Sequence, residues 1–241
     1  MRTSQANVLE VLDRLEAHHG AQQPAGPLDP YEMIVYLNCG YPASDTACTR
    51  GYQALEREVG TDPDKILAAS KARLAKLMRL GGIVPAERAL RLKTIARMVT
   101  QEFGGNLKLA VQKLLQGKEG TAEKRIRQAK TALKKFPVIG DPGADKILLF
   151  ARLAPVAAVP SAFTAVAQRL WHGGENQNYV AGYRAAQQTL AAGLAETFEA
   201  RERAYLLLKR HGQEICKRSK PKCEACPLSG MCRYFLTNRP E

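Results

Sequence analysis

Residues 216–232 read CKRSKPKCEACPLSGMC and place four cysteines close together near the end of the chain. Their spacing is C-x6-C-x2-C-x5-C, and the C-x2-C turn within it is tight enough to hold one metal ion or one edge of a cluster. Four cysteine ligands suit either a structural zinc ion or an iron–sulfur cluster. The pattern therefore predicts a thiolate-bound metal centre with four ligands: Cys216, Cys223, Cys226 and Cys232.

The spacing resembles the cluster loop at the C-terminus of endonuclease III and its relatives, which are DNA glycosylases with a 4Fe–4S cluster. His211-Gly212 also precedes the first ligand as it does in endonuclease III. The resemblance implies a 4Fe–4S cluster, with zinc as the alternative. Iron–sulfur protein is brown and absorbs near roughly 400 nm, whereas zinc protein does not.

The composition is strongly basic. Of the 241 residues, 36 are Lys or Arg and 23 are Asp or Glu, which gives a net charge of +13 and a pI of about 9.6. Such a protein attracts polyanions, usually nucleic acid, although the same charge would suit an acidic membrane surface or serve solubility alone. No apolar run has the length of a membrane span, and the N-terminus lacks the apolar core of a signal peptide. We expect a cytoplasmic, nucleoid-associated protein, in which Cys39 and Cys48 are buried thiols rather than a disulfide.

Apolar residues recur at intervals of three and four, which is the periodicity of amphipathic helices, and alternating strand patterns are hard to find. Thr61-Asp62-Pro63 is typical of a helix start, with a capping residue before proline. The predicted fold class is therefore all-α. Residues 22–30 contain three prolines and one glycine and predict a linker. By resemblance to endonuclease III, residues 28–154 form a six-helix domain, and residues 1–27 with 155–241 form the iron–sulfur cluster domain.

Residues 133–150 read LKKFPVIGDPGADKILLF. They resemble the helix–hairpin–helix of DNA glycosylases, which we assign to residues 131–152; the alternative is an ordinary helix–turn–helix in a bundle. In such a hairpin, turn amides and the N–H groups of the next helix grip phosphate without reading sequence. Pro137, Ile139 and Gly140 fit the pattern. Val138 replaces its first glycine, and a turn that needs positive φ is strained there.

Two basic runs accompany these motifs. One precedes the hairpin turn and includes Lys134 and Lys135; it is either a solvated helix face or a DNA contact. The other lies between the first two cysteine ligands, where a loop held by its thiolates can aim cations at a phosphate backbone. Its members are Lys217, Arg218, Lys220 and Lys222.

The resemblance extends over most of the chain. Residues 30–34, PYEMI, match the family's Pro-Phe-Glu-Leu-Leu helix start, and residues 82–89 resemble its Gly-Leu-Tyr-Asn-Ser-Lys-Ala stretch. An apparent insertion around residues 107–120 adds a short helix. Tyr41 falls where the family places a residue that fills the gap left by a flipped base. It is either such a wedge or a surface tyrosine packing on its own helix.

The family's catalytic pair is missing. Bifunctional members attack the sugar C1′ with a lysine just after the hairpin and use an aspartate about eighteen residues later. Here those positions hold Pro142 and Pro160, which have no ionisable group. Asp141 is interpreted as the N-cap of the second hairpin helix. The catalytic residue is unknown. Lys146, one turn beyond Pro142, is a candidate for a displaced nucleophile; the alternative is a lysine that reaches solvent or pairs with Asp145.

Three function classes stay open. The first interpretation is a monomeric protein of base-excision repair type that binds damaged or distorted double-stranded DNA without the standard Lys/Asp chemistry. The second is a glycosylase with a non-standard active site, and the third is an iron–sulfur scaffold or redox protein. Salt-sensitive duplex binding and base release distinguish them.

Overall fold

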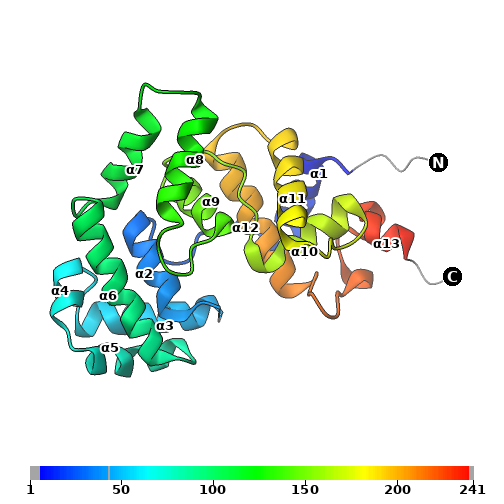
Figure 1. Ribbon diagram of the computed structural model, residues 1–241. Helices are drawn as coiled ribbons and strands as arrows, with labels where there is room; N and C mark the ends of the chain where they lie inside the picture. Colours follow the sequence, from blue (N-terminus) through cyan, green and yellow to red (C-terminus); the bar gives the residue numbers. More distant parts are fainter. Residues whose placement is uncertain (1–5, 43, 239–241) are drawn as a thin grey trace. The chain divides into compact units, whose positions relative to one another are not determined.

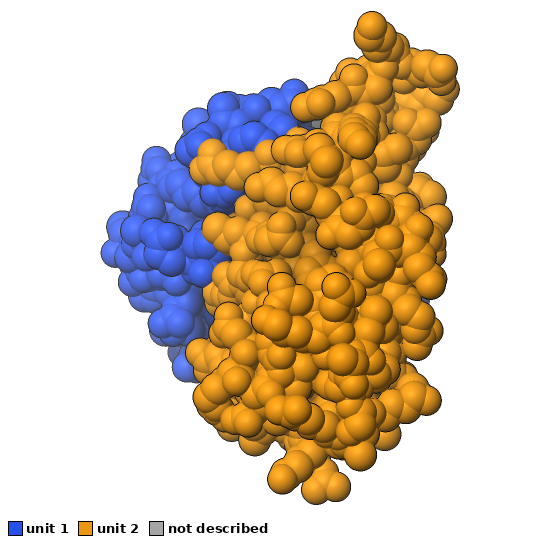
Figure 2. All heavy atoms as spheres, turned by 90° about the vertical axis from the view of Figure 1, so that its left-hand side faces the viewer, with its two compact units in different colours: residues 1–24, 154–241 blue, residues 25–153 orange. Residues whose placement is uncertain are grey.

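The computed structural model describes residues 6–42 and 44–238, and Figure 1 shows the arrangement of its helices. Within these ranges the chain consists of helices and loops and contains no strand, which confirms the all-α prediction. None of the described helices combines the length and apolar character that a membrane span needs. The chain divides into two compact units, coloured separately in Figure 2: Ala25–Leu153, and Met1–Pro24 with Ala154–Glu241.

The unit Ala25–Leu153 is built around the longest helix of the described chain, α6 (Pro85–Glu102), which packs against three other helices. These are α2 (Pro30–Gly40), α4 (Pro63–Ala68) and α5 (Lys71–Met78). Leu92, Ile95 and Val99 recur at helical spacing on α6 and are fully buried. The helix start expected at Asp62-Pro63 is confirmed at α4.

Four further helices complete this unit: α3 (Asp45–Glu58), α7 (Leu107–Gln116), α8 (Ala122–Leu133) and α9 (Asp141–Phe150). The described part of the unit thus holds eight α-helices, where the resemblance implied six. The helix α7 lies in the expected insertion, and α7 and α8 pack side by side (Figure 1). Cys39 on α2 and Cys48 on α3 are buried and form no disulfide, as predicted.

Arg88 ties the start of α6 to the end of α2. Its buried guanidinium donates to the carbonyls of Cys39 at 2.9 Å, Gly40 at 3.2 Å and Gly81 at 2.5 Å. The last carbonyls of a helix have no partner within the helix, so Arg88 caps α2 through two of them. The backbone approach is close, because a Cβ at Gly81 would lie 1.6 Å from the oxygen of Cys39.

The second unit joins the N-terminal helix to the C-terminal part of the chain. Here α1 (Val8–His19) packs on α11 (Tyr179–Gly193) and α12 (Phe198–Glu214), and the short helices α10 (Thr164–Ala167) and α13 (Arg233–Thr237) complete the set. A π-helical turn, Gln168–His172, follows α10 and carries the buried Trp171. The indole N–H of Trp171 donates to the carbonyl of Ala6 at 2.9 Å. This core supports the cysteine-rich segment.

Candidate metal centre and nucleic-acid interface

The four cysteines of the C-terminal motif line one pocket, whose empty space of about 400 Å³ includes open solvent. Two short 3-10 turns, Cys223–Ala225 and Ser229–Met231, bend the chain so that its thiols face the same space. All four thiols are free and half-buried. The rest of the wall is mainly apolar, with Val166, Leu170 and Phe235 among its members.

The state of these thiols suits a centre that binds thiolates. Burial raises the pKa of Cys226 to about 11 and also raises the pKa values of Cys216 and Cys232. Such thiols are neutral at pH 7 until a metal displaces their protons. No three Cys, His, Asp or Glu side chains in the described chain form a site for a single ion. Four sulfur donors sharing a mainly apolar pocket fit an iron–sulfur cluster.

Arg169, in the π-helical turn, holds the beginning of the cysteine segment. Its guanidinium donates to the carbonyls of Lys217 at 2.9 Å and Arg218 at 2.6 Å, and lies 3.7 Å from the sulfur of Cys216. Glu175 pairs with it at 2.6 Å. No sequence motif predicted a role for Arg169, because a single arginine in the short turn QRLWH matches no recognisable pattern. Its contacts fix the backbone from which the basic loop projects.

His211 contacts the same site from α12. One ring nitrogen lies 3.5 Å from the sulfur of Cys226, and the other lies 3.2 Å from a ring nitrogen of His19. His19 in turn pairs with Glu214 at 3.2 Å. Burial lowers the pKa of His211 to about 4, so its ring is neutral at pH 7. The His-Gly pair seen in the sequence thus lies directly against the thiol pocket.

The basic loop between the first two cysteines is open to solvent. All four of its cationic side chains are exposed, and none forms an ion pair with another part of the described chain. Cations without protein partners are the groups that phosphates bind most readily. The four are Lys217, Arg218, Lys220 and Lys222.

The hairpin predicted from the sequence joins α8 to α9. Val138 has a φ of +59°, so a β-branched residue occupies the left-handed region where the resemblance places glycine. The side-chain amide of Asn38 on α2 donates to the carbonyl of Pro137 at 3.1 Å and holds the turn. The N-cap prediction was wrong by one residue. Gly140 is the N-cap of α9, and Asp141 is its first helical residue.

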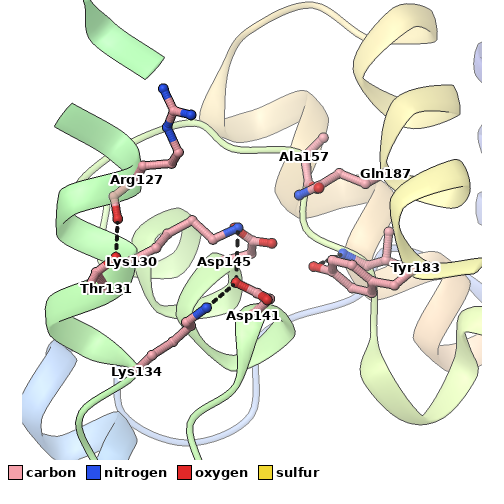
Figure 3. Close-up of polar contacts among 10 residues, drawn as sticks. Arg127, Lys130, Thr131, Lys134, Asp141, Asp145, Ala157, Tyr183 and Gln187 are labelled. Atoms are coloured by element: carbon pink, nitrogen blue, oxygen red, sulfur yellow. Dashed lines mark hydrogen bonds and ion pairs between the residues drawn. The ribbon is translucent and has the colours of Figure 1, made fainter. Parts of the chain in front are cut away.

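The two aspartates of α9 pair with Lys130 of α8 and with Lys134, the C-cap residue of α8, as Figure 3 shows. Lys134 lies 3.0 Å from Asp141, and Lys130 lies 3.8 Å from the same carboxylate. Lys130 also lies 2.8 Å from Asp145, which is only 1% exposed. In the absence of DNA, Lys134 is therefore neutralised by Asp141. The exposed Lys134–Asp141 pair is weak enough for a phosphate to compete with it.

The other predicted contact residues lie on helix ends. Tyr41 is the C-cap of α2 and is 42% exposed, directly after the carbonyls that Arg88 holds. Lys135 follows α8 and pairs with Glu102 at 3.0 Å. Ile139 is buried below the hairpin turn, so it contributes packing, while Gly140 is exposed.

The two positions that the resemblance assigns to the catalytic pair are both prolines, which carry no titratable group. Pro142 is in the first turn of α9, and Pro160 is buried at the N-cap of the 3-10 turn Ser161–Phe163. The carbonyl of Pro160 accepts a hydrogen bond from the backbone N–H of Phe163 at 3.0 Å. Lys146 is half-buried on α9, one turn beyond Pro142.

Comparison with known proteins begins with the cysteine segment. Residues 216–232 match the family model for the iron–sulfur binding domain of endonuclease III. A thymine/uracil-DNA glycosylase of Methanothermobacter thermautotrophicus is 27% identical over 175 residues, which is 71% of this chain and 67% of that protein. Endonuclease III of Sulfolobus acidocaldarius is 24% identical over 199 residues, which is 81% of this chain and 78% of that protein.

Solved structures show the same fold. A trapped endonuclease III–DNA covalent intermediate superimposes with a TM-score of 0.72 at 18% identity, covering 98% of this chain and all of that one. A thermostable thymine-DNA glycosylase gives 0.70 at 21% identity, with 95% of each chain covered. With the matched iron–sulfur domain and its cysteine positions, the cofactor is a 4Fe–4S cluster and not the zinc alternative.

Proposed function

This chain belongs to the endonuclease III-like superfamily, and on that premise we propose that it binds damaged or distorted duplex DNA as a base-excision repair protein. It holds the duplex without the Lys/Asp chemistry of the bifunctional members. The proposal is supported by the pair of prolines, Pro142 and Pro160, at the two positions that the resemblance assigns to the catalytic pair. Proline can neither attack a sugar carbon as an amine nor assist as a carboxylate.

Two surfaces support DNA binding. Backbone N–H groups at the start of α9 are suited to phosphate oxygens, although Pro142 removes one of these donors and Asp141 adds a negative charge there. The exposed cations of the cysteine loop supply a second contact, with a rigidly held backbone. Both contacts are to phosphate, so they position the duplex without reading its sequence. The partner is double-stranded DNA, bound by a monomer associated with the nucleoid.

We assign the cluster a structural role. Cys216, Cys223, Cys226 and Cys232 would ligate it, and the bound cluster supplies a covalent cross-link across residues 216–232. The chain's own residues complete the support. Arg169 binds the carbonyls that follow the first ligand, and His211 packs against Cys226. Together these contacts keep the loop cations pointing toward solvent, where a phosphate backbone can meet them.

A panel of lesion-bearing duplexes, scored for both binding and base release, tests the proposal. The panel includes thymine and uracil mismatches, because one relative is named a thymine/uracil-DNA glycosylase. We expect salt-sensitive binding and no released base. In Lys217→Ala/Lys220→Ala, the slope of log K against log salt should become shallower by about 1.8, since each phosphate contact contributes about 0.9. Release of any base refutes the non-catalytic assignment, and a brown protein without DNA affinity refutes DNA binding in favour of a scaffold or redox role.

One observation favours an enzyme with a non-standard site as the second candidate. The amine of Lys130 and the buried carboxylate of Asp145 meet 2.8 Å apart beside the first turn of α9 (Figure 3). An amine that attacks C1′ of an abasic sugar expels water and forms an imine, which borohydride reduces to a stable protein–DNA adduct. Trapping that is lost in Lys130→Ala or Lys146→Ala would identify the nucleophile. If the unaltered protein forms no borohydride-trapped adduct, this second candidate is excluded.

A further inference from the structure

We propose that the groove between α7 and α8 is a further phosphate-binding track, which lengthens the DNA footprint of this unit beyond the hairpin. The inference rests on the proposed DNA-binding function and extends it to a surface outside the hairpin motif. The groove contains about 740 Å³ of space open to solvent. Its wall consists of Leu114 from α7 and a set of residues on and just after α8: Lys124, Arg127, Gln128, Thr131, Ala132 and Lys135.

The helix α8 presents three different faces. Ala129 and Leu133 are buried in the domain core. Lys130 and Lys134 face α9, where the two aspartates neutralise them. The third face lines the groove, and Figure 3 shows the guanidinium of Arg127 pointing away from the aspartates. The helix therefore separates its paired cations from those that are open to a ligand.

The groove cations have little compensating negative charge. Lys124 and Arg127 are exposed and form no ion pair within the described chain. Lys135 pairs with Glu102, but both side chains are about half exposed, so the pair is weak. Two further acids lie near the start of α8: Glu119 in the loop before it, and Glu123, which is hydrogen-bonded to Thr121 and interacts electrostatically with Arg125 and Arg127. The remaining positive charge favours an anionic ligand.

Arg125, which is not part of the groove wall, joins the two helices that border the groove. The Nε of Arg125 donates to the carbonyl of Leu115 at 2.9 Å, and its Nη1 donates to the carbonyl of Gly120 at 2.8 Å. These bonds attach the start of α8 to the end of α7 and to the loop between them. A preformed groove saves the entropy of ordering its walls when a ligand binds.

The spacing of the polar residues fits an extended phosphate chain. The groove wall includes polar residues spaced three or four positions apart, so successive members lie about 4.5–6 Å apart along the axis of α8 and its C-terminal end. They are Lys124, Arg127, Thr131 and Lys135. The row measures about 16 Å, close to the length of five nucleotides at about 3.4 Å per nucleotide on one strand. An acidic protein segment fits less well, because Leu114 and Ala132 are the only apolar residues of the groove wall and no aromatic side chain is present there as an anchor.

The test compares Lys124→Ala/Arg127→Ala with the unaltered holoprotein on a duplex of about 12 base pairs and on one of about 30, lengths chosen against the 3.4 Å rise per base pair. We expect affinity for the long duplex to fall at least tenfold at about 0.1 M salt, and its salt slope to become shallower by about 1.8. Affinity for the short duplex should not change. The matched control is Lys71→Ala/Lys76→Ala, which removes two exposed cations from α5.

The outcomes separate this inference from the proposed function. Equal affinity of the variant and the unaltered protein for both duplexes overturns the groove, while leaving duplex binding intact. A polyglutamate peptide tests the acidic protein partner. If the unaltered protein binds this peptide, the variant does not, and the DNA affinities of the two are equal, the phosphate-binding groove is overturned in favour of an acidic protein partner. Lys124→Gln/Arg127→Gln repeats the test with polar side chains. An unaltered protein that binds neither duplex overturns the proposed function and the groove together.

Discussion

Replacing Arg88 with methionine should destabilise the unit Ala25–Leu153 by several kcal/mol and loosen the turn that carries Tyr41. The guanidinium is 1% exposed and donates to three carbonyls, at 2.5, 2.9 and 3.2 Å. Methionine has a similar length and keeps the apolar packing, but it offers no donor. The substitution therefore isolates the three hydrogen bonds from the volume of the side chain.

The magnitude follows from the acceptors that lose their partner. Each buried carbonyl left unsatisfied costs about 1–2 kcal/mol, so three cost about 3–6 kcal/mol. The Nε of Arg88 has no acceptor in the described chain, and removing that buried donor returns about 1 kcal/mol. The expected net loss in the free energy of unfolding is about 2–5 kcal/mol, a large part of the stability of a typical domain.

Urea unfolding, followed by a probe in this unit, measures the loss as a lower transition midpoint. The control is Arg91→Met on the same helix; Arg91 pairs with Glu87 at the surface, so we expect a change below about 1 kcal/mol. Because Tyr41 directly follows α2, Arg88→Met should also weaken DNA binding in conditions where the protein stays folded. A loss below about 1 kcal/mol for Arg88→Met would refute the capping role.

The remaining predictions concern the hairpin, the buried pair and the cluster. A β-branched residue in the left-handed region, as at Val138, costs about 1–2 kcal/mol, and Val138→Gly removes that cost while giving the unfolded chain more freedom. The substitution should raise the free energy of unfolding in urea by about 0.5–1 kcal/mol and tighten DNA binding. A lower urea midpoint would contradict this. Lys130→Met or Asp145→Leu alone should each lower the free energy of unfolding by about 2–4 kcal/mol, because each leaves the other charge buried without its partner. The double variant should be nearly as stable as the unaltered protein. Additive losses in this double-mutant cycle would show that the two groups do not interact. Cys226→Ala should yield colourless protein with a protease-sensitive cysteine segment, while Cys48→Ala stays brown; iron retained in Cys226→Ala argues against its role as a ligand.

Local patterns in the sequence were sufficient for the metal motif and the helical class. The four cysteines lie within seventeen residues, so their spacing restricts the geometry whatever surrounds it. Helical periodicity is also a local pattern, and the helix that it predicted around residues 90–99 is confirmed as α6. The strain predicted at Val138 also appears as a positive φ, because turn geometry demands it. The N-cap of α9 was placed one residue late, since glycine and aspartate are both N-cap residues and proline is tolerated throughout the first turn.

Tertiary packing decided which charges are neutralised and which remain open. Arg88 meets Cys39 across 49 positions of sequence, and His19 meets His211 across 192. The run of cations before the hairpin looked uniform in the sequence, yet Lys130 and Lys134 bind aspartates while Arg127 lines an open groove. Hydrogen bonds and ion pairs act over a few ångströms, so their partners are set by how helices pack and rotate against one another. The sequence by itself therefore determined the cluster motif and placed prolines where the resemblance expects the catalytic pair, whereas only the folded chain decided which cations are open to a phosphate backbone.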